Sequence, residues 1–180
     1  MSINDVVPYA QSFTAVIATA ALGVAFWSLQ AQKAVARRRA AVDFFLKTDL
    51  DEKLLEAYSR YRTAAQKLPH IVDFGAFCTT TDFDDIRGYL NVVELMAVGV
   101  LNETFDERIC YVYWKDFVMR VMSDTAKLID YLREIDGEHS YSNFRRVHYY
   151  WMTNPELAIR WEQGGRPLRK GPTLTAAPGY

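Results

Sequence analysis

The sequence predicts an all-α protein in which one N-terminal transmembrane helix continues into a helical bundle of about four to five helices, followed by a disordered C-terminal tail. Three observations predict this fold. Residues 6–32 contain no charged side chain. Apolar residues downstream recur at intervals of three and four, which is helical spacing, and no segment alternates apolar and polar residues as a half-buried strand does. Residues 164–180 include four glycines and three prolines, a composition typical of disorder.

The anchor prediction depends on the length and the flanks of the uncharged stretch. At about 1.5 Å per residue, 20 residues of helix cover the roughly 30 Å of bilayer hydrocarbon. Tyr9 and Trp27 lie near the two ends, where aromatic rings settle at headgroups. Two alternatives stay open: a cleaved signal peptide, for which small residues near Ala18 and Ala20 could serve as the cleavage site, and a buried core helix of a soluble protein.

Four cations follow the predicted span, namely Lys33, Arg37, Arg38 and Arg39, and none precedes it. The positive-inside rule then predicts a single-pass membrane protein with its N-terminus outside and its C-terminal domain in the cytoplasm. We expect these cations to form a membrane flank, with binding of anionic lipid headgroups as the alternative.

Three small residues, Ala15, Thr19 and Gly23, recur every four residues on one face of the predicted helix. Such a face lets two helices approach closely, so it is a candidate helix-packing face for self-association.

Composition and charge divide the chain into four predicted parts. Half of its 180 residues are apolar, which allows a sizeable core, and its net charge is −1. The parts are the anchor at 1–32, a basic juxtamembrane helix at 33–47, a helical domain at 48–163 and the tail at 164–180. The helical domain has 20 acidic and 13 basic residues, a net charge of −7, which argues against a nucleic-acid partner.

Helix boundaries in the domain follow from caps and breakers. Capping boxes at Thr48 with Asp51 and at Thr104 with Glu107 predict helices over about 49–67 and 105–135. Further helices are expected over about 82–101, from Ser140 or Ser142 to about 152, and from Asn154-Pro155 to 163. A long connection, 68–81, separates the helix at about 49–67 from the helix at about 82–101.

Asn91 and Glu94 are the candidate buried polar residues, because Glu94 lies on the apolar stripe of Leu90 and Ala97. We expect a structural link to Asn91 or to an arginine of another helix. Glu94, Glu103, Asp106 and Glu107 could form a metal or acid–base site. However, no histidine accompanies them at helical spacing, so we expect no metal and no cofactor.

A basic and aromatic helix near the C-terminus contains Arg145, Arg146, Tyr149 and Tyr150, which form a candidate partner surface. Phe144, Val147 or His148, and Trp151 form one apolar face of the same helix, which favours a role in the core. The two cysteines, Cys78 and Cys110, lack a neighbouring histidine or a Cys-x-x-Cys partner, so we expect both to be inert.

Several sequence segments together carry a family resemblance. They are the Arg37-Arg38-Arg39-Ala40 flank leading to Asp43-Phe44-Phe45, the run from Tyr89 to Val100 (YLNVVELMAVGV), Asp106-Glu107, Leu128 to Arg133 (LIDYLR), and Arg160-Trp161-Glu162. Over roughly 34–163 the chain resembles a family of small bacterial and phage membrane-anchored helical proteins, catalogued as a domain of unknown function. The resemblance implies a single-span anchor in the bacterial inner membrane with a cytosolic helical domain, and it supplies no activity or ligand.

Two classes of function remain for this sequence. The first is a membrane-anchored cytosolic interaction or scaffold module that joins a membrane assembly or binds copies of itself, with no small-molecule substrate identified. The second is a membrane-associated enzyme or toxic effector such as a nuclease, using Glu94, Arg133, His139 or His148. The spacing of Arg133 and His139 resembles that of helical ribonucleases of the HEPN type, but Gly137 interrupts it.

Overall fold

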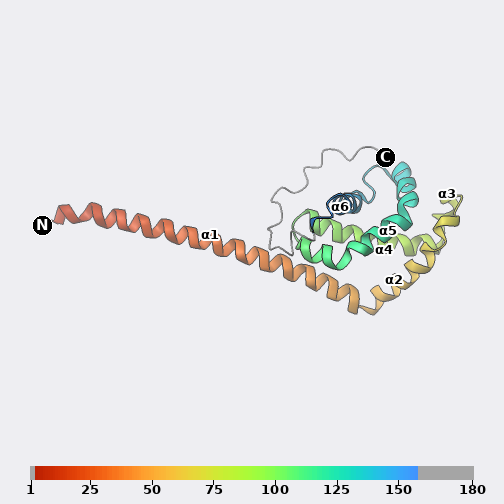
Figure 1. Cartoon of the computed structure of the whole chain (residues 1–180), viewed down its shortest axis with the longest axis horizontal. Helices are drawn as coiled ribbons and strands as arrows, with labels where there is room; N and C mark the ends of the chain where they lie inside the picture. The colour runs from red at the N-terminus through yellow and green to blue at the C-terminus, as the bar shows by residue number, and fades with distance from the viewer. Residues whose placement is uncertain (1–2, 158–180) are drawn as a thin grey trace.

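Helix α1, Ile3–Leu50, is an unbroken rod of 48 residues whose N-terminal part projects away from the rest of the protein (Figure 1). The computed structural model describes residues 3–157, and it describes side chains from residue 16 onward. The predicted continuation of the N-terminal helix through the basic segment 33–47 is confirmed, and the helix runs on to Leu50. Alanine and arginine, both strong helix formers, are the commonest residues of this segment.

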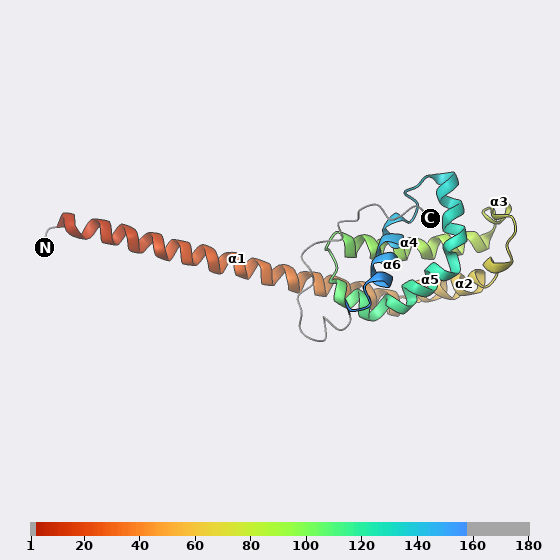
Figure 2. The same cartoon turned by 45° about the horizontal axis from the view of Figure 1, so that its top comes forward.

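Four further helices form the body of the molecule: α2 (Glu52–Ala65), α4 (Thr81–Leu101), α5 (Glu107–Asp136) and α6 (Ser142–Thr153). Helix α4 packs against α2 on one side and α6 on another, and α5 packs against α6 (Figure 2). The connection at 68–81 contains two short helices, η1 (Leu68–His70) and α3 (Phe74–Phe77). No residue in the described part of the chain is in a strand, so the all-α prediction is confirmed.

The prediction of a transmembrane helix is wrong: over the residues that the structure describes, no helix is both long enough and apolar enough to cross a membrane. The physical reason lies in the composition of α1. Residues 16–32 contain five alanines together with Ser28, Gln30 and Gln32, and Lys33 follows directly. These side chains dilute the aliphatic ones, and the charge ends the apolar segment. The part of the predicted span before residue 16 lies outside the residues with described side chains.

Both predicted capping boxes are wrong by two or three residues. Thr48 lies inside α1, where its hydroxyl donates to the Phe45 carbonyl at 2.9 Å. Asp51 caps α2 instead, with its carboxylate accepting from the backbone N–H groups of Lys53 at 2.9 Å and Leu54 at 3.3 Å. A helix N-cap needs an acceptor for two orphan amides, and the Asp51 carboxylate meets that need on its own.

At the start of α5 the cap is Asp106, which accepts from the Ile109 N–H at 3.3 Å. Thr104 is unsuited because its own N–H donates to the Gly99 carbonyl at 2.9 Å, which places it in the turn that ends α4. Gly137, with φ of 103°, closes α5 as predicted. The structure describes only the first residues of the helix predicted from Asn154, and the predicted tail lies outside the described residues.

The core is built around α4, whose stripe of Ile86, Leu90, Val93 and Ala97 is completely buried. Opposing side chains from α5 and α6 are equally buried: Leu128, Ile129, Phe144, Val147 and Trp151. Full burial of one such large apolar side chain stabilises a fold by about 1.5–3 kcal/mol. This core therefore fixes α4, α5 and α6 relative to one another and gives α1 a rigid surface to dock on.

The turn after α4 depends on Gly99. A Cβ at this position would overlap the ring of Phe105, which folds back over the end of α4. The N–H groups of Thr104 and Phe105 both donate to the Gly99 carbonyl at 2.9 Å, so this turn and the ring are held together.

We predict that Gly99→Ala destabilises the protein by about 1–3 kcal/mol, because the added methyl group overpacks a buried site. Gly88 on the same helix is the matched control, since a Cβ there meets nothing within 4 Å. Gly88→Ala should instead stabilise the fold by up to about 1 kcal/mol through helix propensity. Denaturant unfolding measures both effects, and equal effects of the two substitutions would contradict this account.

Candidate functional site

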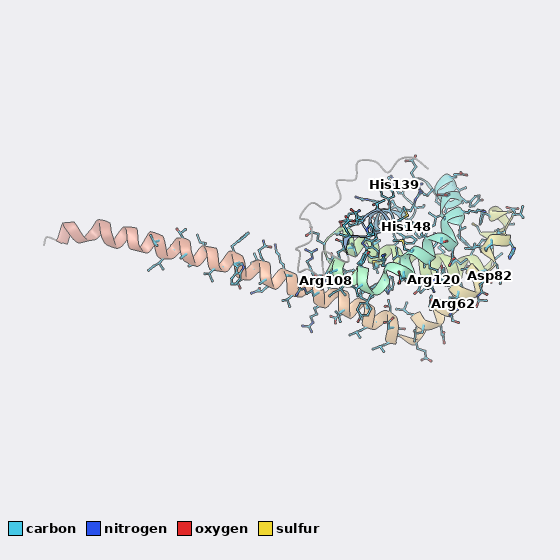
Figure 3. The ribbon with its side chains drawn as sticks, in the orientation of Figure 1. Arg62, Asp82, Arg108, Arg120, His139 and His148 are labelled. Carbon is cyan, nitrogen blue, oxygen red and sulfur yellow. The ribbon has the colours of Figure 1, made fainter. Side chains whose placement is uncertain are left out.

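The projecting section of α1, residues 16–36, is the least covered part of the described chain. Nearly every side chain in it is exposed, including large apolar ones such as Trp27 at 75%, Leu22 at 72% and Val24 at 66%. Leu22 points to the opposite side of the rod from Val24 and Trp27, because a helix turns about 100° per residue. Figure 3 shows this section standing clear of the body. An apolar helix that is exposed all round is incomplete without a covering environment.

The predicted flank cations divide into two groups. Arg37 pairs with Glu103 at 3.1 Å and Arg38 with Asp106 at 3.4 Å, so both hold α1 to the turn between α4 and α5. Exposed pairs of this kind contribute about 0–1 kcal/mol each. Arg39, with 83% of its side chain exposed, pairs only loosely with Asp43 of its own helix at 3.8 Å. Lys33 is exposed on the projecting section.

An aromatic cluster, formed by Phe44, Phe45, Phe105, Tyr113 and Trp114, fixes α1 to the body. Phe44 lies 5.1 Å from Phe105 and 5.7 Å from Trp114 between ring centroids, and Phe45 lies 5.4 Å from both Tyr113 and Trp114. Aromatic pairs at such distances contribute about 0.5–1.5 kcal/mol beyond area burial. We did not predict this joint; two adjacent phenylalanines in an alanine-rich helix were the signal for it.

Of the two residues predicted to be buried and polar, Asn91 is exposed, whereas Glu94 is half-buried and caps α6. The Glu94 carboxylate accepts from the Phe144 N–H at 2.7 Å, from the Asn143 side chain at 2.8 Å and from the Asn143 N–H at 3.3 Å. The Tyr141 hydroxyl donates to Asn91 at 3.4 Å. Glu94 therefore satisfies amides at the positive end of α6 from a neighbouring helix. The prediction that Asn91 or an arginine would be the partner of Glu94 is wrong, because the first residues of α6 lie within hydrogen-bond distance of this carboxylate.

Glu107 forms a second link to α6, where the Trp151 indole N–H donates to its carboxylate at 3.2 Å. Burial raises the pKa of this carboxyl above its ordinary value. The indole hydrogen bond opposes the shift, whereas the neighbouring Asp106 adds to it. Burial also raises the pKa of the Cys110 thiol to about 12 and that of Cys78 in the same direction, so both thiols stay protonated at neutral pH.

The candidate partner surface on α6 is only partly open. Arg146 is exposed, Arg145 pairs with Asp130 at 3.3 Å, and Tyr149 and Tyr150 are half-buried. The opposite face, with Phe144, Val147 and Trp151, lies in the core as the pattern indicated. In the small-residue face, Thr19 is exposed and a Cβ at Gly23 meets nothing, whereas the Ala15 side chain lies outside the described residues.

The residues considered for catalysis serve separate local roles. Arg133 donates to the Glu138 carbonyl at 3.1 Å, and Glu94 caps α6. His139 lies in the exposed turn after α5, whereas His148 is half-buried on α6, and its burial lowers its pKa (Figure 3). Among the described residues, no group of three or more histidine, cysteine, aspartate or glutamate side chains could hold a metal ion.

Together these features define an all-α protein in which a rigid helical body carries one long projecting helix with an uncovered apolar section. The chain belongs to the family described as Domain of unknown function (DUF4760), whose model matches residues 15–151. The predicted membership of an uncharacterised family is thereby confirmed. No curated protein and no solved structure shows significant similarity to the chain.

We predict that Glu94→Ala destabilises the protein by about 1–3 kcal/mol, because two amides of α6 lose a charged acceptor. Glu56, an exposed residue that pairs only with Arg60 one turn away, is the control, and Glu56→Ala should change stability by no more than about 0.5 kcal/mol. Thermal melts followed by circular dichroism measure the difference. A catalytic role for Glu94 would require lost activity at unchanged stability.

We predict a pH-dependent effect of Glu107→Gln, which keeps an acceptor for Trp151. The folded pKa of Glu107 lies above its unfolded value, so the folded state binds the extra proton and loses stability as pH rises through that interval. The glutamine side chain of the variant does not titrate, so the variant does not lose stability over this pH interval. Its free energy of unfolding relative to wild type should therefore improve between pH 4 and pH 7 in denaturant titrations, and a pH-independent difference would contradict the assignment.

Proposed function

We propose that the protein is a helical interaction module that works at a membrane surface. In this proposal, the projecting section of α1 contacts lipid and the body presents surfaces to protein partners. The single observation that carries the proposal is the exposure, on all sides of α1, of apolar side chains in a section without charge between residues 16 and 32. The proposal concerns contact with lipid and requires no span.

The cost of leaving this section in water supports a lipid contact. Transfer of apolar surface out of water is worth about 25 cal/mol per Å², so side chains such as Leu22, Phe26 and Trp27 together favour a lipid environment by several kcal/mol. Trp27 lies six residues before Lys33, and aromatic rings with adjacent cations favour the headgroup region. Lys33 and Arg39 are exposed, and each adds about 1 kcal/mol on an anionic surface.

A role in interaction is supported by the rigid joint between α1 and the body. Because the aromatic cluster fixes the body on α1, lipid contact by the projecting section would hold the body at the membrane and raise its effective concentration for partners there. Two exposed side chains offer contacts to such partners, namely Arg146 on α6 and Leu95 on α4, and the Leu95 side chain is 57% exposed. Both cysteines are free, which suits the reducing cytoplasm that we propose as its location.

Vesicle flotation tests the proposal. The full-length protein, purified in mild detergent and then diluted out of it, should float with phosphatidylcholine vesicles. It should float more completely when phosphatidylglycerol is included, because each cation adds about 1 kcal/mol on an anionic surface. A variant that combines Leu22→Gln, Phe26→Gln and Trp27→Gln should lose most of this binding while its helical circular dichroism stays unchanged.

The matched control is Leu55→Gln, which changes an exposed apolar residue of the body that is 49% exposed and should leave flotation unchanged. Wild-type protein that stays at the bottom of the gradient with both vesicle types, although monodisperse and folded, would overturn the proposal.

A further inference from the structure

We infer that two copies of this chain pair in parallel along one face of α1. This inference deepens the proposed function, on which it rests, by naming a second copy as the first protein partner of the module. The face, here called the pairing stripe, consists of Ile17, Ala21, Val24, Ser28, Ala31, Val35 and Val42.

The spacing of the pairing stripe indicates a helix as its occupant. Steps of four and three residues alternate from Ile17 through Val42, with Arg38 at the one remaining position. This average period of about 3.5 residues is the one that two supercoiled helices share. The stripe is open along its whole length, since Ile17 is 54% exposed, Val24 66%, Val35 64% and Val42 41%.

The length and the chemistry of the stripe fit α1 of a second copy. From Ile17 to Val42 the stripe measures about 38 Å, so its occupant is a long rod with a matching face that is apolar apart from the position of Arg38. Small side chains at Ala21, Ser28 and Ala31 are interspersed among β-branched ones, an arrangement that lets two identical helices approach closely. The stripe also continues beyond the projecting section, since Val42 lies beside Ala41, which is buried against the body.

Charge does not oppose a parallel pair. Arg38 is the ionisable side chain on the pattern, and its guanidinium is bonded to Asp106 of its own body at 3.4 Å. Two Arg38 side chains would therefore meet already neutralised by their own chains. The next position in the pattern, Phe45, is 3% exposed because it packs on Tyr113 and Trp114, so the stripe ends where the body begins.

The side of α1 on which the body lies favours pairing along this stripe over pairing along the small-residue face of Thr19 and Gly23. Gly23 and Ala41 are separated by 18 residues, about five full turns, so both point to the same side of α1. Ala41 is completely buried against the body. A parallel copy laid along the small-residue face would therefore run into the body, whereas the pairing stripe lies about 100° away from it.

Cysteine cross-linking tests the inference with the full-length chain. In a Cys78→Ser background, with Cys110 left buried, Val24→Cys and Val35→Cys should each give a covalent dimer under mild oxidation on a non-reducing gel. The matched controls are Leu22→Cys and Gly23→Cys, which lie on other faces of the same exposed section and should give severalfold less dimer. The measurement is made in mild detergent and again in vesicles.

Cross-linking that is absent at Val24 and Val35, or equal at the control positions, would overturn the inference. A dimer at Leu22 or Gly23 alone would overturn it as well, because another face would then be paired. The two proposals fail separately. Specific cross-links in detergent without flotation would overturn lipid contact alone, and flotation without specific cross-links would overturn pairing alone.

Discussion

The joint between α1 and the body is the constraint on which the rest of this structure depends. Phe44 and Phe45 insert between Phe105 of the α4–α5 turn and the Tyr113–Trp114 segment of α5. A single long helix held only by exposed ion pairs would swing, because such pairs contribute little. Packing of bulky rings, by contrast, is close and has few alternative arrangements. The direction in which α1 leaves the body, and hence everything it presents, follows from this packing.

Residues at the turn between α4 and α5 support this joint between α1 and the body. Gly99 leaves room for the Phe105 ring, and Asp106 both caps α5 and pairs with Arg38 of α1. One residue further on, Glu107 reaches the Trp151 indole of α6. The turn between α4 and α5 thus connects α1 on one side with α6 on the other.

Periodicity predicted the helices well, because apolar spacing and breakers such as Gly137 act locally. It failed where tertiary contacts decided the outcome. Thr104 has the right type and spacing for a cap, yet its N–H donates to the Gly99 carbonyl in the turn that ends α4. Glu94 was recognised as a polar residue on a buried stripe, but its partners on α6 depend on how two helices cross. The uncharged run of α1 predicted a span, and alanine, serine and glutamine dilute its apolar character too far within the described residues.

The aromatic cluster fixes α1 rigidly on the body, so the axis of α1 leaves the body in one direction. Pulsed electron paramagnetic resonance tests it most directly, using spin labels at Leu29→Cys on α1 and Ile135→Cys on α5, both exposed positions. Labelled protein is diluted with unlabelled protein in a Cys78→Ser background. We expect one narrow distance distribution that broadens when Phe44 and Phe45 are both replaced by alanine. A broad distribution in the protein with both phenylalanines intact would contradict it.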